Sequence, residues 1–313
     1  MTAASYPAPN RPGPSARRVL YTHPGLAVFL LLLPPLLWFG TVYLGSLLSL
    51  LAQSVYSIDD FTGEIVRVPS LMTFRALLSQ PAHLDIVLRT LAMAVMVAAF
   101  SVPIAFPVAY FMARYARGRI KALFFGTVML PMWTSYLVKV YAWRLILAKQ
   151  GIVSWAFDQL GLSAALEAVL KLPLVGGPSL ASSYMGMLLV FVYMWLPFVI
   201  LPIEAALERV PRALVEASGD LGATPRQTLM RVILPLAVPG IAAGSIFAFS
   251  LTLGDYIIPQ VVGAPGYFIG MMVYEQQGTA GNVPLAAAFS IVPIILIGLY
   301  LLMARRLGAF DAL

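Results

Sequence analysis

Few side chains in this chain of 313 residues could do catalytic chemistry. The only histidines are His23 and His83, so a pair of histidine metal ligands at helical spacing is impossible. Cysteine is absent, which excludes disulfides and thiolate metal sites, and we expect no metal. A phosphate-binding loop is also missing, because serine and leucine follow the glycine pair Gly40 and Gly45. We therefore expect no ATP site and no cofactor in this chain, and an enzyme is a poor interpretation.

Asp255 stands apart from the other acidic residues because it lies near the outer end of a long apolar run. A charge at membrane depth costs a few kcal/mol and is usually functional or paired. Beside Tyr256, Asp255 can supply the counter-charge that a cationic substrate needs along a pathway. Alternatively, Asp255 caps a helix end or forms an ion pair with Lys139 or Arg144. These interpretations are compatible if the ion pair opens during transport, and the sequence leaves both open.

Aromatic residues accompany these charges. Tyr136, Lys139 and Trp143 recur at i, i+3 and i+7, so they share one face of a helix. Lys139 can contact Trp143 through a cation–π interaction, and we favour a structural pairing because a cation pathway would repel an unpaired lysine. Trp133 and Trp195 are candidate walls of the pathway, although residence at the membrane interface is the favoured interpretation for both.

Membrane helices must position these residues. Hydrophobic residues make up 60% of the chain and charged residues only 11%, with a mean hydropathy of +0.88. A soluble domain carries about 25% charged residues. A membrane-spanning helix needs roughly 20 apolar residues. Six runs are long enough, of which the third is weakest because Lys139 and Arg144 lie inside it; they cover residues 25–52, 86–113, 123–147, 180–206, 236–258 and 284–304.

The basic residues predict the orientation of these spans. With both termini in the cytoplasm, the inside holds 13 of the 20 basic residues but only 5 of the 13 acidic residues. The positive-inside rule favours this arrangement, because the reverse would translocate the cluster at residues 114–121. The net charge of +7 thus mainly encodes topology, and we expect membrane lipid and no nucleic acid as a partner.

The remaining segments are a tail and connections around a single membrane domain over residues 25–313. Residues 1–24 are rich in proline, alanine, serine and arginine and predict a disordered cytoplasmic tail. Outside the membrane, we expect turn or cap chemistry at residues 57–60, short interfacial helices within 148–179, and an irregular path over 259–283.

The longest inside connection, residues 207–235, carries the most specific signal. Pro211 favours a helix start, Gly222 is suited to a positive φ at its end, and Pro225 can open a second helix. We expect Leu234–Pro235 to break that second helix before the next span. Two short helices joined at a glycine can dock into a groove on a partner, and an ordinary connecting loop is the alternative.

This segment resembles the EAA loop of ATP-binding-cassette importer permeases, with the pattern E-A-A-x-x-x-G followed nine residues later by I-x-L-P. Val232 stands at the isoleucine position, and Ser218 replaces the third small residue. The matching residues are Glu216, Ala217, Gly222, Leu234 and Pro235. The resemblance covers about residues 85–305, and stretches 130–143, 194–198 and 253–259 are similar to spermidine/putrescine-type permeases.

The resemblance implies an all-α membrane protein with six transmembrane helices in the type I importer permease arrangement and both termini cytoplasmic. It implies a place in the bacterial inner membrane, where the loop at 207–235 couples to the ATPase. Implied partners are two ATPase subunits that bind the ATP, a second homologous permease and an external binding protein.

Polyamines are the expected substrate. Related importers for iron, thiamine, aminophosphonates or opine-like amino-acid derivatives share the architecture and remain alternatives. A self-contained secondary transporter is disfavoured, because no inverted repeat is visible.

Overall fold

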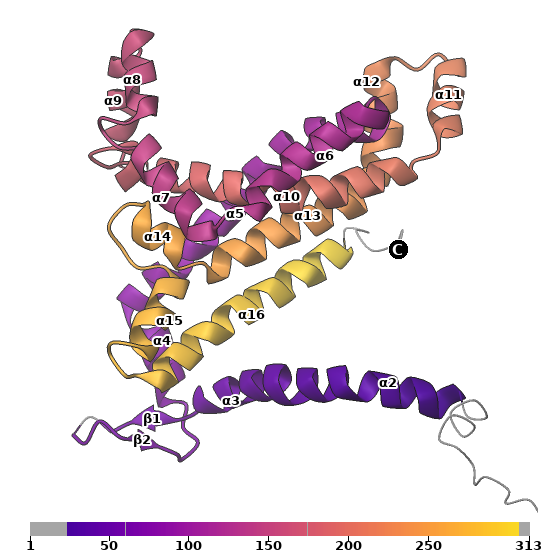
Figure 1. Cartoon of the computed structure of the whole chain (residues 1–313). Coiled ribbons are helices and arrows are strands. Elements are labelled where there is room, and N and C mark those ends of the chain that lie inside the picture. The colour runs from indigo at the N-terminus through magenta and orange to yellow at the C-terminus, as the bar shows by residue number, and fades with distance from the viewer. Residues whose placement is uncertain (1–23, 60, 174, 307–313) are drawn as a thin grey trace, which may run out of the picture. The chain divides into compact units, whose positions relative to one another are not determined.

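The computed structural model describes residues 24–306 apart from residues 60 and 174 (Figure 1). The expected tail therefore lies outside the described residues, save for Pro24. The chain divides into two compact units, one ending at Gln53 and one beginning at Ser54.

The first unit is a single apolar helix in its described part. It comprises α2 (Pro24–Trp38), a π-helical stretch η1 (Phe39–Leu44) and α3 (Gly45–Gln53). Thr41 lies in the π-helical stretch, and its hydroxyl donates to the carbonyl of Leu37 over 2.6 Å, so this polar group is satisfied within the helix. This helix confirms the first predicted span.

Four further helices of the second unit are long and apolar enough to cross a membrane. They are α5 (Pro81–Arg114), α10 (Tyr184–Arg209), the continuous helix formed by α12 (Pro225–Thr228), η3 (Leu229–Ile233) and α13 (Leu234–Gly254), and α16 (Val283–Arg306). Three of them follow the predicted runs closely, whereas the continuous helix begins at Pro225, well before the predicted start at residue 236.

The third predicted span is broken. It consists of α6 (Gly118–Trp133) and α7 (Tyr136–Ile146), which meet at 95° across residues 134–135. Pro131 lies in the last turn of α6, where proline removes a helical hydrogen bond. Counting this bent pair as one span gives the predicted six.

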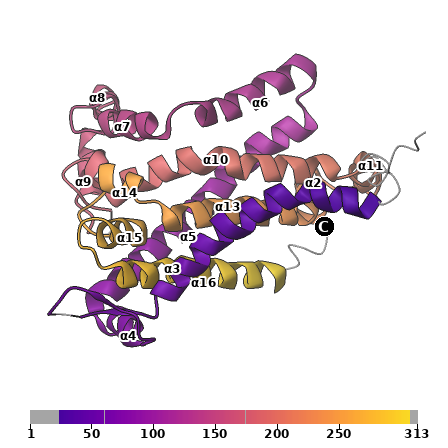
Figure 2. The same cartoon turned by 60° about the horizontal axis from the view of Figure 1, so that its bottom comes forward.

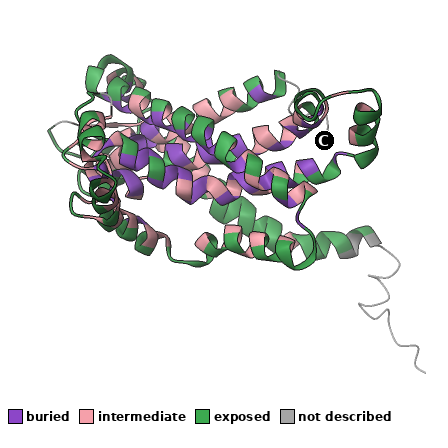
Figure 3. Cartoon of the chain, turned by 90° about the horizontal axis from the view of Figure 1, so that it is seen from above, coloured by how far each residue is buried: buried purple, intermediate pink, exposed green. Residues whose placement is uncertain are grey.

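The core of the second unit lies where α5, α10 and α13 pack together, and buried residues gather on their facing sides (Figure 3). Gly240 and Gly244 of α13 bring its backbone against α10. A Cβ at Gly240 would lie 2.5 Å from the carbonyl oxygen of Pro202, and one at Gly244 would lie 2.9 Å from that of Val199. The G-x-x-x-G spacing therefore serves packing within this chain.

The segments that were expected to lie outside the membrane contain more regular structure than expected. Strands β1 (Ser57–Ile58) and β2 (Ile65–Val66) form an antiparallel hairpin, and the Asp59 carboxylate accepts hydrogen bonds from the amides of Phe61 and Thr62. This confirms turn chemistry at Asp59, and these two bonds hold its pKa below the ordinary value.

Several short helices complete the fold. The expected short helices within 148–179 are α8 (Ile152–Gln159) and α9 (Ser163–Leu170), joined at Gly161 with φ of 68°. The expected irregular path over 259–283 is wrong in part, because helix α15 (Ile269–Gln277) occupies its centre. The remaining elements are α4 (Met72–Ser79), the 3-10 turn η2 (Leu180–Ser182) and α14 (Ile257–Val261). Figures 1 and 2 show α8 and α9 at one end of the second unit and α11 (Arg212–Asp220) at the other.

Candidate functional site

Asp255 lies at the break between α13 and α14, where the backbone becomes extended. One carboxylate oxygen accepts from the amide of Ile258 over 2.9 Å and so caps α14. The other oxygen accepts from the phenol of Tyr136 on α7. The expected cap was at the end of the fifth span, whereas the carboxylate instead bonds to the first turn of the following helix, α14. The carboxylate joins two broken helices that are far apart in sequence.

The ion pair expected between Asp255 and Lys139 or Arg144 is not formed within the described part of the chain. The ammonium of Lys139 instead donates to the carbonyl of Pro131 over 2.5 Å. That carbonyl lies in the last turn of α6, where the break leaves it without a helical donor, and it also accepts from the hydroxyl of Thr134 over 3.0 Å. Arg144 is exposed. The pairing prediction was wrong because it assumed a continuous helix, whereas the bend gives Lys139 a nearer acceptor.

Aromatic rings frame Asp255. The ring of Tyr136 stacks on Trp195 of α10 with 6.1 Å between centroids, and Tyr256 stacks on Tyr274 of α15 at 4.8 Å. Gly270 allows this approach of α15, because a Cβ there would lie 2.6 Å from the carbonyl oxygen of Asp255. The shared face of Tyr136, Lys139 and Trp143 is confirmed by their partial burial. Trp143, however, packs against Tyr193 and makes no cation–π contact with Lys139 among the described residues.

A cavity of about 360 Å³ opens beside this carboxylate. Its lining combines one acid, two aromatic rings and small or apolar groups: Trp195, Ser250, Leu251, Gly254, Asp255, Tyr256 and Ile257. Trp195 is only 9% exposed and lines this cavity, which supports the other interpretation considered for it, a wall of the pathway. Its indole N–H has no hydrogen-bond partner among the described residues.

Trp133 is 79% exposed and is not among the residues that line this cavity. Its place among the candidate pathway residues therefore has no support from this geometry.

A carboxylate flanked by aromatic faces can hold an alkylammonium group, because both attract a cation that is partly removed from water.

The inside connection forms two helices joined at a glycine, as predicted. Gly222 has φ of 77°, and α12 begins with a capping box in which Thr224 and Gln227 exchange hydrogen bonds. The expected break at Leu234–Pro235 is wrong, because the helix continues into α13. A π-helical turn precedes Pro235, and the amide of Leu234 donates to the carbonyl of Leu229. This wider π-helical turn allows the helix to continue through Pro235, which has no backbone N–H to donate.

The two helices of this connection are tied together by Ser218. Its hydroxyl lies 2.9 Å from that of Thr228, and its carbonyl accepts from the amide of Ala223 over 3.1 Å. Leu221 projects from the joint and is 89% exposed, while Glu216 is exposed on α11. A hollow of about 570 Å³ runs beside Leu221 and is lined by residues that include Ala217, Ser218 and Gly222. Leu221 was not singled out from the sequence, because only its position at the joint makes it conspicuous.

Lys121 links the start of α6 to the end of α10. Its ammonium lies 3.2 Å from the carboxylate of Glu204, which is buried, and also contacts the more exposed Glu208. These residues lie on α6 and α10, more than eighty positions apart. No local spacing in the sequence could have revealed this pairing.

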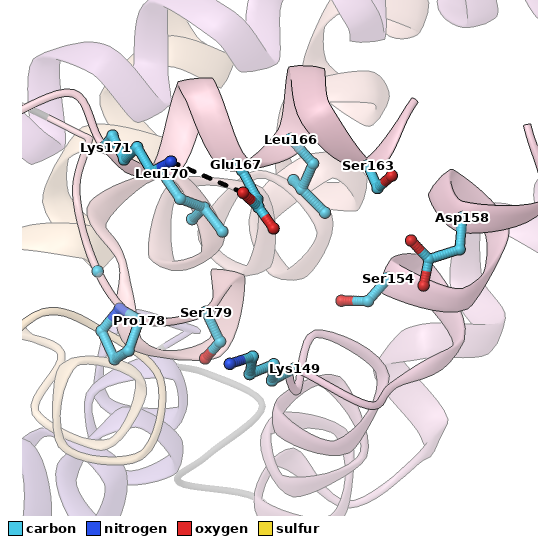
Figure 4. A pocket seen from close by; sticks show the side chains of 11 residues that line it. Lys149, Ser154, Asp158, Ser163, Leu166, Glu167, Leu170, Lys171, Pro178 and Ser179 are labelled. Atoms are coloured by element: carbon cyan, nitrogen blue, oxygen red, sulfur yellow. Dashed lines mark ion pairs between the residues drawn. The ribbon is translucent and has the colours of Figure 1, made fainter. Parts of the chain in front are cut away.

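A polar hollow of about 360 Å³ lies between α8 and α9 (Figure 4). Charges of both signs line it, with Lys149 and Ser179 on one side and Asp158 and Ser154 on another. Glu167 pairs with Lys171 over 3.7 Å, and both side chains are exposed. The balanced charge gives this hollow no preference for cations or anions, so it is a weaker candidate than the cavity at Asp255.

Known proteins resemble this chain over most of its length. The family "Binding-protein-dependent transport system inner membrane component" matches residues 86–309. The inner membrane ABC transporter permease protein YdcU of Escherichia coli K12 is 60% identical over 98% of both chains. The spermidine/putrescine transport system permease protein PotB of Salmonella typhimurium LT2 is 27% identical over 92% of both chains.

A solved structure shares the fold. It is that of a bacterial alginate ABC transporter in complex with an alginate pentasaccharide-bound periplasmic protein. The TM-score is 0.70 at 17% identity, and the match covers 94% of this chain and 98% of the other.

Proposed function

The chain belongs to the family of binding-protein-dependent transport system inner membrane components, and from this premise we propose that it forms the pathway for a polyamine. Its class is that of an inner-membrane permease subunit of an ABC importer, with the all-α permease fold. The substrate is the further step. PotB relatives at 27% identity are named for spermidine and putrescine, whereas the name of the YdcU relative gives no substrate.

The observation that carries the polyamine proposal is the cavity at Asp255. A polyamine presents ammonium groups separated by short apolar segments. Asp255 offers a carboxylate to one ammonium, and the faces of Trp195 and Tyr256 suit the charge and the methylene groups. The Tyr136 phenol already bonded to Asp255 would yield to an ammonium, because a charge-assisted bond is stronger than a neutral one.

The proposed assembly follows the family. ATP is bound by two ATPase subunits, of which one docks on the α11–α12 helices of this chain through Glu216, Leu221 and the hollow beside Leu221, and the other docks on the second permease. A second related permease completes the pathway, and an external binding protein delivers the substrate. Closure of the ATPases moves the α11–α12 helices, and the pathway switches from outward-facing to inward-facing. This chain contributes no cofactor and no ATPase site of its own.

Uptake by the assembled importer in proteoliposomes tests the substrate proposal. Labelled putrescine and spermidine, added outside with the binding protein, should be taken up when the ATPase subunits face the vesicle lumen and ATP is enclosed there. Asp255→Asn should lower that uptake about tenfold, the ratio for a loss of about 1.4 kcal/mol of cation stabilisation. Asp158→Asn, an exposed acid on α8, is the matched control and should leave uptake unchanged.

Three outcomes would contradict the proposal. Wild-type uptake by Asp255→Asn would remove the carboxylate from the pathway. Uptake of iron, thiamine, an aminophosphonate or an opine-like compound in place of polyamines would replace the substrate class. Uptake by this chain alone, driven by an ion gradient, would make it a secondary transporter.

A further inference from the structure

A basic cavity lies where the end of α5 meets α11, away from the cavity at Asp255. Its volume is about 270 Å³. Three guanidinium groups line it, from Arg114 at the end of α5, Arg117 in the following turn and Arg212 at the start of α11. The α5–α6 turn and α11 lie at the same end of the second unit in Figures 1 and 2.

Arg114 places hydrogen-bond donors without acceptors at this cavity. Two of its guanidinium nitrogens, Nε and Nη2, are buried and have no hydrogen-bond partner among the described residues. A guanidinium cannot lose its proton, and burial of an unpartnered N–H group is unfavourable. Nε and one Nη form the edge that binds two oxygens of a carboxylate or phosphate side by side.

The protein itself does not balance this charge. Glu216 is the one acid in the lining, so three arginines leave a net charge of +2. Within the part of the chain that the structure describes, Glu216 forms no ion pair with any of the three arginines. A bound anion would therefore balance the remaining charge and accept from the guanidinium groups that Glu216 leaves unpaired.

The rest of the lining favours an amphipathic anion. Tyr110 and Tyr115 line the cavity and carry hydroxyl groups that can donate to phosphate oxygens, and their rings meet edge to face at 5.9 Å. Val215 and the buried Ile233 supply an apolar wall. The cavity also lies at the end of α5, a helix long and apolar enough to cross a membrane, and phospholipid phosphates are expected near the ends of such helices.

We propose that this cavity binds the phosphate of an anionic phospholipid, held mainly by the Arg114 fork and supported by Arg117 and Arg212. Basic pockets between membrane helices bind such headgroups, and each nearby arginine strengthens the attraction. Because α11 supplies Arg212, the bound lipid bridges the end of α5 and the segment proposed to meet the ATPase. Lipid composition then affects how firmly that segment is held.

Native mass spectrometry of the assembled importer, delipidated in detergent, tests this site. Phosphatidylglycerol and cardiolipin should remain bound at concentrations where phosphatidylcholine does not. Arg114→Gln should weaken their binding about tenfold or more, and Arg114→Lys should restore part of it. Arg305→Gln removes an exposed arginine at the end of α16 and should leave binding unchanged. If Arg114→Gln fails to fold, the exposed Arg212→Gln should still weaken anionic lipid binding.

Equal lipid binding by the wild type, Arg114→Gln and Arg212→Gln would overturn the proposal. Complete displacement of the lipid by millimolar inorganic phosphate would assign the cavity to a free anion. Loss of the ATPase subunits from Arg114→Gln with unchanged lipid binding would assign it to an acidic side chain of that partner.

Discussion

The phenol of Tyr136 donates a hydrogen bond to the carboxylate of Asp255, across 119 residues of sequence. This bond joins two discontinuities, the bend before α7 and the break after α13. Helices broken at membrane depth expose backbone groups that must find partners, and such places commonly form binding sites in transporters. The carboxylate in this bond lines one cavity together with two aromatic rings, at the junction between α13 and α14.

Tyr136→Phe removes the phenol donor and keeps the ring that stacks on Trp195. We expect a loss of about 1 kcal/mol in the free energy of unfolding, the net contribution of a typical hydrogen bond. Thermal unfolding of the purified chain measures this loss. Asp255→Asn should change the free energy of unfolding less in the Tyr136→Phe background than in the wild type. Full additivity of the two changes would show that the side chains are not coupled.

Trp195→Leu removes a wall of the cavity at Asp255, whereas Trp133→Leu changes an exposed ring. Polyamine uptake by the assembled importer should fall several-fold with Trp195→Leu, because a cation–π contact contributes about 0.5–2 kcal/mol. Trp133→Leu should leave uptake within twofold of the wild type. The reverse ranking would place the pathway at Trp133 and away from this cavity.

Lys139→Met removes one of the two donors to the carbonyl of Pro131 at the bend between α6 and α7, and the Thr134 hydroxyl remains at 3.0 Å. The unfolding free energy should fall by about 1 kcal/mol, the net contribution of a typical hydrogen bond. Arg144→Gln, on an exposed position of the same helix, should change it by less than about 0.5 kcal/mol. Equal effects in denaturant titrations would show that Lys139 is not the residue that stabilises the bend.

Gly222→Ala and Gly219→Ala should have opposite effects on stability. Gly222 has φ of 77°, so alanine there is strained by roughly 1–2 kcal/mol. Gly219 lies in α11 with open space around its Cα, where alanine should stabilise by roughly 0.5–1 kcal/mol. Calorimetry measures the signs, and ATP hydrolysis per transported substrate should rise only for Gly222→Ala. Destabilisation by both changes would mean that α11 is not a regular helix in the assembled importer.

Much of the architecture could be read from local patterns. Five of the six apolar runs match spans to within about five residues, because the length of an apolar segment alone satisfies the membrane requirement, whereas the fifth helix begins earlier, at Pro225. The joint at Gly222 and the helix start at Pro225 were likewise visible, since glycine and proline have distinctive backbone preferences wherever they occur. The strands at residues 57–66 and helix α15 were missed, because polar connections carry weaker periodicity.

The sequence by itself determined the class of protein, the spans and the two-helix connection, since these depend on composition and on neighbours along the chain. Only the tertiary structure decided the partners of the charged groups. In the folded chain Asp255 accepts from Tyr136, Lys139 donates to the carbonyl of Pro131, and Lys121 pairs with Glu204. Trp195 lines the cavity at Asp255, and two guanidinium nitrogens of Arg114 have no acceptor among the described residues. The physical reason is that a buried polar group bonds to whatever the helix bends bring within about 3 Å, and the bends are set by packing of distant segments.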